Sequence, residues 1–163
     1  MQLIISLIRV TIKSFNIKLG NHSLMEIVKA TEAHMKELSA LLKGLDTEEY
    51  SFSEEEKVAP LIQEGNYYIA IEENKIVGAI GLVIIEESCE IDALITSKKG
   101  VGKALIDFAI ELCKKEDVKK LWCWSLKRYN AIGFYDKMGF EEQFLLKKHW
   151  CGEDCYIFGK VIE

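Results

Sequence analysis

The sequence is poor in proline and histidine and has no excess of basic residues. It contains one proline, Pro60, and three histidines. We find no proline-rich linker, internal repeat or other low-complexity segment along the chain. Lys and Arg total 21 against 26 Asp and Glu, so the formal net charge is -5. Nucleic-acid-binding domains usually carry a basic stripe, and we therefore expect no nucleic-acid partner.

Long uninterrupted apolar runs are also missing. The opening stretch MQLIISLIRVTIKSF is broken by Arg9 and Lys13, which makes it too short and too charged to span a bilayer. It lacks the basic start and continuous apolar core of a signal peptide. We expect no membrane partner. Alternation through residues 9–12 would suit a short strand; alternatively, translation begins at Met25. We therefore divide the chain into an N-terminal extension, residues 1–24, and a domain, residues 25–163.

The cysteine count is odd, and no secretory pattern precedes the cysteines. A reduced, cytoplasmic setting is the simpler interpretation. Cys151 and Cys155 either face each other across a hairpin turn or flank that turn as reduced thiols, which the compartment favours. A zinc site would need a second pair of ligands at comparable spacing, and the sequence has no second cysteine pair. We expect no metal.

Hydrophobic periodicity and turn residues predict one mixed α/β domain. Gly78 and Gly81 lie inside a predicted strand and indicate a bulge or bend there. Pro60 lies deep enough in its predicted helix to break or kink it. The predicted order is a strand at 27–30, a helix at 31–44, a helix from about 53, strands at 66–71, 75–85 and 89–96, a helix at 100–115, a strand at 118–125, a short helix at 131–138, and a hairpin of 144–150 with 156–162.

The stretch TSKKGVGKALI, residues 96–106, has the features of an anion-binding loop. Backbone N–H groups at a helix start attract anions, and glycine lets a diphosphate approach the backbone. A P-loop requires Ser or Thr after the lysine, where Ala104 stands, and a Rossmann fingerprint requires glycine in place of Leu105. A kinase or a conventional oxidoreductase is therefore improbable. A glycine-rich turn with solvated lysines remains the alternative for this loop.

Residues 130–140 read NAIGFYDKMGF. Together with GVGKALI about thirty residues earlier and a strand between them, this stretch resembles the GNAT superfamily of acetyl-CoA-dependent N-acetyltransferases. The resemblance runs from about Met25 to Glu163. It implies a central mixed β-sheet flanked by helices, and an enzyme that moves an acetyl group from the cosubstrate acetyl-CoA to a primary amine.

The resemblance also implies a cofactor site between two splayed parallel strands, residues 89–96 and 118–125. The family usually carries Arg or Gln where Ser97 stands, and the loop after it is several residues shorter than usual, so Lys98 or Lys99 would supply the cation. The pantetheine arm would meet Leu94, Ile95 and Thr96, the diphosphate would meet Lys99, Gly100, Val101, Gly102 and Lys103, and Asn130 and Phe134 would lie beside the arm.

Acetyl transfer needs a neutral amine, although an alkyl amine has a pKa of about 10.4 in water. Glu90 occupies the position of the glutamate that many family members use as a base, and alternation puts Asp92 on the same strand face. Tyr135 occupies the place of the tyrosine that protonates the leaving thiolate. The alternatives are a solvated strand edge and a half-buried structural tyrosine. A covalent route through Cys123 or Cys89 is a further alternative, without a histidine partner in the sequence.

The acceptor is the least defined part. Tyr50, Phe52 and the acidic run Glu54–Glu56 correspond to the family's acceptor side, and Trp122 and Trp124 share one strand face. Aromatic walls with acids suit a cationic amine of a small molecule or a peptide, although core tryptophans and a solvated helix start explain them equally well. We predict direct transfer in a ternary complex. The rival is a non-catalytic acyl-CoA-binding or interaction module, and the closing hairpin and apolar N-terminal segment could serve a homodimer.

Overall fold

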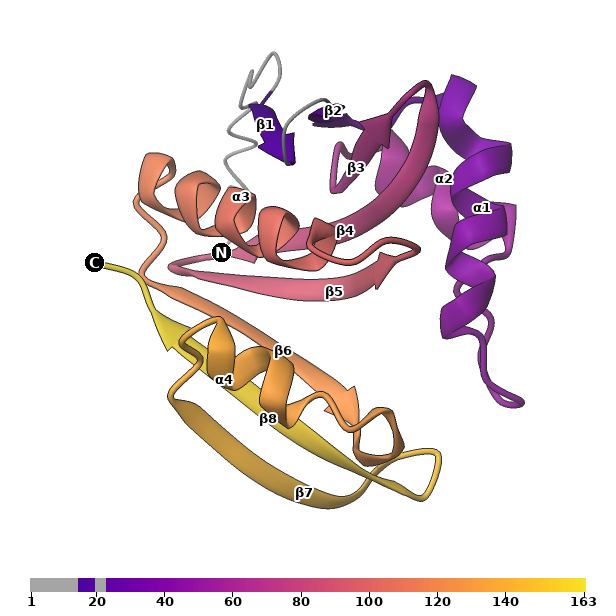
Figure 1. Cartoon of the computed structure of the whole chain (residues 1–163). Coiled ribbons are helices and arrows are strands. Elements are labelled where there is room, and N and C mark those ends of the chain that lie inside the picture. The colour runs from indigo at the N-terminus through magenta and orange to yellow at the C-terminus, as the bar shows by residue number, and fades with distance from the viewer. Residues whose placement is uncertain (1–14, 20–22) are drawn as a thin grey trace, which may run out of the picture.

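The computed structural model describes residues 15–19 and 23–163. Within them, eight strands form one mixed sheet in the order β1-β2-β3-β4-β5-β6-β8-β7 (Figure 1). The strands are β1 Phe15–Leu19, β2 Ser23–Lys29, β3 Tyr67–Glu72, β4 Lys75–Ile85, β5 Ser88–Thr96, β6 Lys120–Leu126, β7 Glu142–Trp150 and β8 Glu153–Val161. The helices are α1 Met35–Leu42, α2 Glu55–Gln63, α3 Val101–Lys115 and α4 Ile132–Lys137.

The predicted order of elements from residue 25 onward is confirmed. Strand β4 has the predicted bounds, and α3 begins one residue after the predicted start. Helix α2 continues through Pro60. Strand β1 pairs antiparallel with β2, and the strand expected at residues 9–12 lies outside the described residues. No helix in the described part of the chain is long and apolar enough to cross a membrane.

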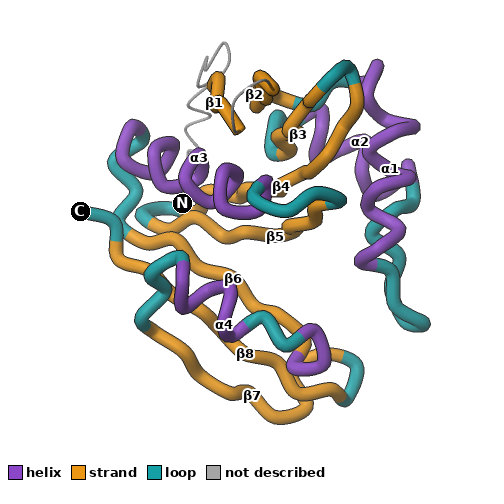
Figure 2. The backbone as a smooth tube through the Cα atoms, in the orientation of Figure 1, coloured by secondary structure: helices purple, strands orange, loops and turns teal. Residues whose placement is uncertain are grey.

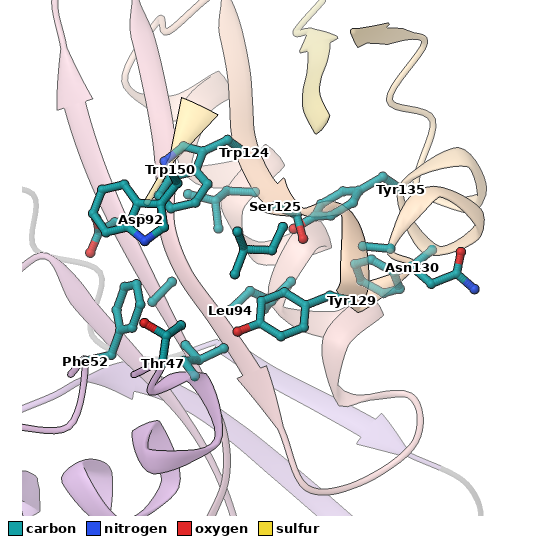
Figure 3. Close-up of a pocket in the computed structure, with 16 residues that line it drawn as sticks. Thr47, Phe52, Asp92, Leu94, Trp124, Ser125, Tyr129, Asn130, Tyr135 and Trp150 are labelled. Atoms are coloured by element: carbon teal, nitrogen blue, oxygen red, sulfur yellow. The ribbon is translucent and has the colours of Figure 1, made fainter. Parts of the chain in front are cut away.

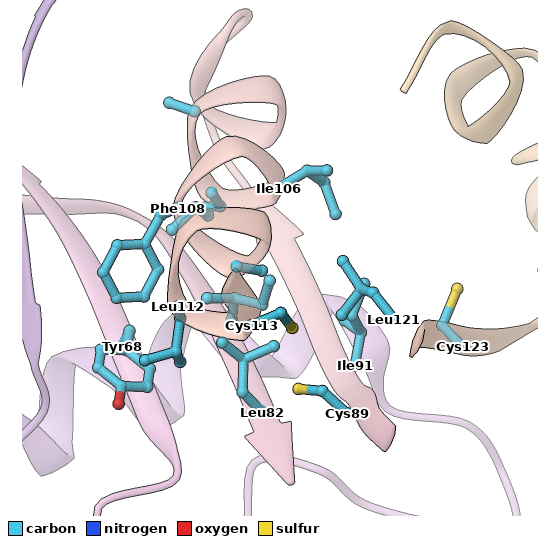
Figure 4. Packing of buried hydrophobic residues seen from close by; sticks show 14 of the residues in the cluster. Tyr68, Leu82, Cys89, Ile91, Ile106, Phe108, Leu112, Cys113, Leu121 and Cys123 are labelled. Atoms are coloured by element: carbon cyan, nitrogen blue, oxygen red, sulfur yellow. The ribbon is translucent and has the colours of Figure 1, made fainter. Parts of the chain in front are cut away.

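Helices cover both faces of the sheet and make two cores. On one face α3 buries Phe108 and Leu112 against sheet residues that include Tyr68 and Leu82 (Figure 4). On the other face α1 and α2 bury Leu38 and other apolar side chains against β3 and β4. This layering follows from the helical spacing of apolar residues in each helix, because burying one apolar stripe is the main stabilising term for a short helix.

Two one-residue irregularities interrupt the ladder around β4, near the two glycines that predicted them. Gly78 pairs with Ala70 while Ile76 pairs with Ile71, so Val77 is extra. On the other side of β4, Gly81 pairs with Ala93 and Leu82 with Ile91, which leaves Asp92 as an extra residue on β5. A bulge of this kind bends a strand and re-aims its side chains.

The bulged part of β5 is also where the sheet opens. Strands β5 and β6 are parallel and pair only from Ser88 with Lys120 to Glu90 with Trp122. Beyond that point they diverge, as Figure 1 shows. The loop after β5 returns directly into α3, and the loop after β6 leads into α4 (Figure 2). The divergence leaves one edge of β5 without a strand partner from Ile91 onward.

Candidate active site between the diverging strands

The divergence of β5 and β6 encloses a pocket of about 340 Å³. This volume lies within the usual range for small-ligand sites, about 300–1,000 Å³. Asp92, Trp124 and Trp150 gather at one end of the pocket, and Asn130 and Tyr135 lie at the other end (Figure 3). The two ends therefore differ in chemistry: one combines a carboxylate with indole rings, and the other combines an amide with a phenol.

The aromatic end is built from three distant segments. Trp124 on β6 and Trp150 at the end of β7 pack with ring centroids 5.0 Å apart. Tyr50 packs edge-on against Trp150 at 5.7 Å and against Phe52 at 4.8 Å. Contacts of this geometry stabilise by about 0.5–1.5 kcal/mol beyond area burial. The result is a continuous wall of four rings around one end of the pocket.

Asp46 fixes the loop that carries Phe52 into this wall. Its carboxylate accepts the backbone N–H of Phe52 at 2.6 Å and that of Ser53 at 3.0 Å. It also accepts the Ser53 hydroxyl at 2.6 Å. Hydrogen bonds to a charged acceptor are the stronger ones in proteins. Thr47 adds a second anchor in the loop between α1 and α2, because its hydroxyl accepts the backbone N–H of Tyr50 at 3.0 Å.

Two carboxylates stand at the bulge of β5, as alternation predicts. Asp92 lines the pocket and is exposed to solvent, while the protein atoms around its carboxyl reduce the hydration of that group and raise its pKa. Glu90 is half-buried outside the lining of the pocket. Burial, and then the negative charge of Asp92, raise the pKa of Glu90, while a hydrogen bond from Trp124 lowers it. The two acids therefore hold protons more tightly than exposed carboxyls do.

Tyr135 lines the other end and is 6% exposed. Its ring stacks on Phe158 at 4.4 Å. Burial raises the pKa of Tyr135 well above its usual value, and its hydroxyl donates to the thiol of Cys123. Burial also raises the pKa of Cys123 to about 12. Both groups therefore stay protonated near neutral pH, so Cys123 is a poor nucleophile and Tyr135 keeps its hydroxyl proton, as a weaker acid than an exposed tyrosine.

The glycine loop opens α3 as predicted. Gly100 precedes the helix with φ +90°, a left-handed conformation that glycine adopts without strain. The first helical bond into this turn runs from Ala104 N–H to the Gly100 carbonyl at 3.2 Å, so the N–H groups of Gly102 and Lys103 precede the helical ladder. A Cβ at Gly102 would lie 3.3 Å from Cε2 of Phe134. The loop thus offers donors beside an aromatic ring.

The lysines of this loop differ in their surroundings. Lys98 pairs with the buried carboxylate of Glu72 at 2.5 Å, on β3. Lys103 pairs with Asp107 one turn further along α3, also at 2.5 Å. Within residues 15–19 and 23–163, Lys99 makes no ion pair. Of the two lysines predicted to replace the usual loop cation, Lys99 is therefore the one whose charge is not already matched.

The other predicted cofactor residues differ in whether their side chains line the pocket. Leu94, Asn130 and Phe134 line the pocket. Ile95 packs toward the α1–α2 side of the sheet, and Val101 is fully buried against Gly78, so these two can offer only backbone groups. Thr96 is exposed at the end of β5.

Sequence reasoning missed several pocket residues. It assigned Trp150 to the closing hairpin and gave no role to Thr47, Ser125 or Tyr129, which all line the pocket. None of them forms a local motif with the glycine loop. The nearest signal in the sequence is that aromatic residues, among them Tyr129 and Trp150, follow β6 along the chain. Of the two tryptophans on β6, Trp124 lines the pocket and Trp122 does not.

A second cavity, of about 380 Å³, lies between the end of α3, the start of β7 and the end of β8. Two of its polar side chains are already partnered: Glu142 pairs with Lys120, and Lys160 donates to the Gly139 carbonyl at 3.1 Å. The described residues contain no group of three or more metal-ligating side chains. All cysteines in the described part of the chain are free thiols. Cys155 lies opposite Leu146 in the register of the β7–β8 hairpin and does not face Cys151.

Comparison with known proteins bears on the same region. Residues 31–140 match the acetyltransferase (GNAT) family, over more than half of the chain. The uncharacterized protein YxbD of Bacillus subtilis (strain 168) is 32% identical over 77 residues, which are 45% of this chain and 48% of that protein. The chain therefore spans about half the length of this relative.

Two crystal structures share the fold. Ard1 from Thermoplasma volcanium has a TM-score of 0.75 at 18% identity, covering 85% of this chain and 98% of that one. The PaiA N-acetyltransferase from Thermoplasma acidophilum, in complex with coenzyme A, has a TM-score of 0.66 at 20% identity, covering 84% and 98%. At these identities the likeness is one of fold, with the same mixed sheet and flanking helices.

Proposed function

The chain belongs to the GNAT family of acetyltransferases, and from this we propose that it transfers the acetyl group of acetyl-CoA directly to a primary amine of a small molecule or peptide. The observation that carries the proposal is the end of β5–β6 pairing at Glu90 and Trp122. It leaves a backbone edge and a pocket next to the glycine loop, where a thioester and an amine can meet.

The residues present fit the cosubstrate. The loop Lys99–Lys103 offers backbone donors before the first helical bond of α3, and a helix N-terminus favours a diphosphate. The unpaired edge of β5 at Leu94–Thr96 offers hydrogen-bonding groups to an amide-containing arm. Asn130 and Phe134 flank the same path. Acetyl-CoA supplies the activated acetyl thioester.

In the proposed reaction the amine nitrogen bonds to the acetyl carbon as the carbon–sulfur bond breaks. Glu90 takes the proton that the amine loses, and because it lies outside the pocket lining it does so through water. Tyr135 gives its proton to the leaving thiolate. A backbone N–H near Leu94 stabilises the developing oxyanion. The raised pKa of Cys123, about 12, supports direct transfer over a covalent acetyl-cysteine route.

The ion pairs of Lys98 and Lys103 favour a second candidate, a non-catalytic acyl-CoA-binding or interaction module with weak affinity. Calorimetric titration with acetyl-CoA, beside NAD and ATP as controls, tests the cofactor assignment. Amine-dependent release of free thiol then tests transfer. Binding without thiol release across a broad amine panel would support the module, and absence of acetyl-CoA binding would overturn both candidates.

A further inference from the structure

The carboxylate of Asp92 has no positively charged or hydrogen-bonding partner among the described residues. It nevertheless faces a concave, mostly apolar pocket, and these surroundings raise its pKa. Asp92 is at the same time open to solvent, so an incoming ammonium group can reach its carboxylate. The bulge that turns Asp92 into the pocket thus presents an acceptor of positive charge to whatever binds there.

The wall around Asp92 is aromatic. Among the residues that line the pocket are Phe52, Trp124 and Trp150, and Tyr50 packs behind Phe52 and Trp150. This wall already attracts an ammonium group on its outer side, because Lys57 Nζ lies 4.3 Å from the centroid of the Tyr50 ring. Aromatic faces bind cations and stack on flat apolar groups.

We infer that the acceptor is an arylalkylamine: a primary amine with one ammonium group and a flat apolar body. The ammonium pairs with Asp92, and the flat body stacks on Trp124 and Trp150. Figure 3 shows these three side chains at the same end of the pocket, away from Asn130 and Tyr135. The inference rests on the proposed function, since it assigns that pocket end to the acetylated amine.

The charges in the pocket argue against other classes of amine. Asp92 is the one charged side chain among the described residues that line it. An amino acid would bring a carboxylate next to Asp92 without a basic residue to receive it, and like charges at such close range repel. A diamine or polyamine would bring a second ammonium group, and the nearest further carboxylate, Glu90, lies outside the lining and is hydrogen-bonded by Trp124. A lining of rings also leaves few polar groups for a peptide backbone.

Binding can be measured without catalysis because Trp124 and Trp150 form the proposed site. Quenching of tryptophan fluorescence by phenethylamine and tryptamine gives their dissociation constants for the full-length chain, with and without acetyl-CoA. Phenylalanine is the matched comparison for charge, since it is phenethylamine with an added carboxylate. Putrescine tests a second cation without a ring, and a short peptide with an amino-terminal alanine tests the peptide class. We expect phenethylamine to bind at least about 100-fold more tightly than phenylalanine.

Variants assign the effect to particular residues. Asp92→Asn keeps the shape of the side chain and removes its charge, and we expect it to weaken phenethylamine binding at least tenfold. Trp150→Leu removes one ring and should weaken binding about tenfold. Trp122→Leu is the control, because Trp122 shares the strand face of Trp124 but does not line the pocket. It should leave the dissociation constant within twofold of the original.

The outcomes separate this inference from the proposed function. Preferential binding of phenethylamine, lost in Asp92→Asn, supports the inference even if acetyl-CoA and the amine produce no free thiol; the proposed transfer would then be wrong. Acetylation of putrescine, of phenylalanine or of the peptide in preference to both arylalkylamines would overturn the inference and leave the transferase intact. Equal loss of binding in Trp122→Leu and Trp150→Leu would also overturn it.

Discussion

Lys98 donates from its ammonium to the carboxylate of Glu72 at 2.5 Å, and this ion pair joins the glycine loop to β3. The Glu72 side chain is 7% exposed and that of Lys98 is 49% exposed, so the pair spans from core to surface. The ion pair therefore ties the loop that would hold a diphosphate to β3. In the sheet, β3 is separated by β4 from β5 and β6, the two strands that form the pocket.

Removing the charge of Glu72 should reduce stability. Glu72→Gln keeps the side-chain shape but loses a charge-assisted hydrogen bond, and we expect unfolding to become easier by about 1–3 kcal/mol. Urea denaturation measures this difference. Asp107→Asn is the matched control: its partner Lys103 lies on the surface, where an ion pair contributes about 0–1 kcal/mol. Equal losses in the two variants would contradict a structural role for the buried pair.

Tyr135→Phe should separate chemistry from binding. The variant keeps the ring that stacks on Phe158 and removes only the hydroxyl. If Tyr135 protonates the leaving thiolate, kcat falls by about 100-fold, at the lower end of general acid–base effects. The dissociation constant for acetyl-CoA, measured by calorimetry, should stay unchanged. A variant that retains half of the original kcat would show that Tyr135 has only a structural role.

Two glycines of the loop should respond differently to alanine. Gly100→Ala forces a side chain into the left-handed region at φ +90°, which costs about 1–2 kcal/mol of stability. Gly102→Ala has no such strain, but its Cβ lies 3.3 Å from Phe134 Cε2 and projects beside the proposed cofactor path. We expect it to weaken acetyl-CoA binding about tenfold with little change in thermal midpoint. Gly133→Ala, with nothing within 4 Å of its added Cβ, is the control for both measurements.

Asp92 should reduce stability at neutral pH, and its dependence on pH has a definite sign. Because the folded state raises the pKa of Asp92, the folded chain binds protons more tightly than the unfolded chain. Stability therefore falls as pH rises from the ordinary carboxyl value of about 3.9 to the raised value, and the loss is complete above it. Because Asp92 is exposed to solvent, the effect is small, and Asp92→Asn should have a slightly higher thermal midpoint at pH 7. Asp117→Asn, at a side chain that is 84% exposed, should change little.

The same carboxylates predict a kinetic distinction. If Glu90 is the base, Glu90→Gln lowers kcat, whereas Asp92→Asn mainly raises KM for the amine. Asp92→Asn also removes the nearby negative charge that raises the pKa of Glu90, so the acid limb of the kcat profile should move to lower pH. A loss of kcat in Asp92→Asn as large as that in Glu90→Gln would move the role of base to Asp92.

The elements that the sequence predicted well are those with strong local periodicity. Strand β4 is a long run rich in β-branched residues that begins directly after the turn at Asn74, and α3 repeats apolar residues over four turns. The loop and helix of the GNAT resemblance are also local. Trp150 and Asp46 could not be predicted in the same way, because their roles depend on contacts with β6 and with residues 52–53, which only the folded chain brings together.

The ion pairs of the glycine loop also depend partly on contacts between residues far apart in the sequence. Three lysines in sequence look equivalent, yet two are matched by acids on different elements, Glu72 on β3 and Asp107 on α3. The partner Asp107 lies four residues after Lys103, a spacing that predicts an ion pair on a helix. Glu72 lies 26 residues before Lys98, and no local pattern connects them.

The extra residue Asp92 gives β5 two different neighbours along its length. Before it, Cys89 and Ile91 face the layer under α3; after it, Ala93 and Ile95 face the layer under α1 and α2. A deletion of this single residue would restore an unbroken alternation in which Ile91 still pairs with Leu82 and Ala93 with Gly81, so every later side chain of the strand would keep its present layer. The bulge is therefore separable from the two cores: its removal would take the carboxylate from the pocket and the bend from the strand, while both layers keep the side chains that they have.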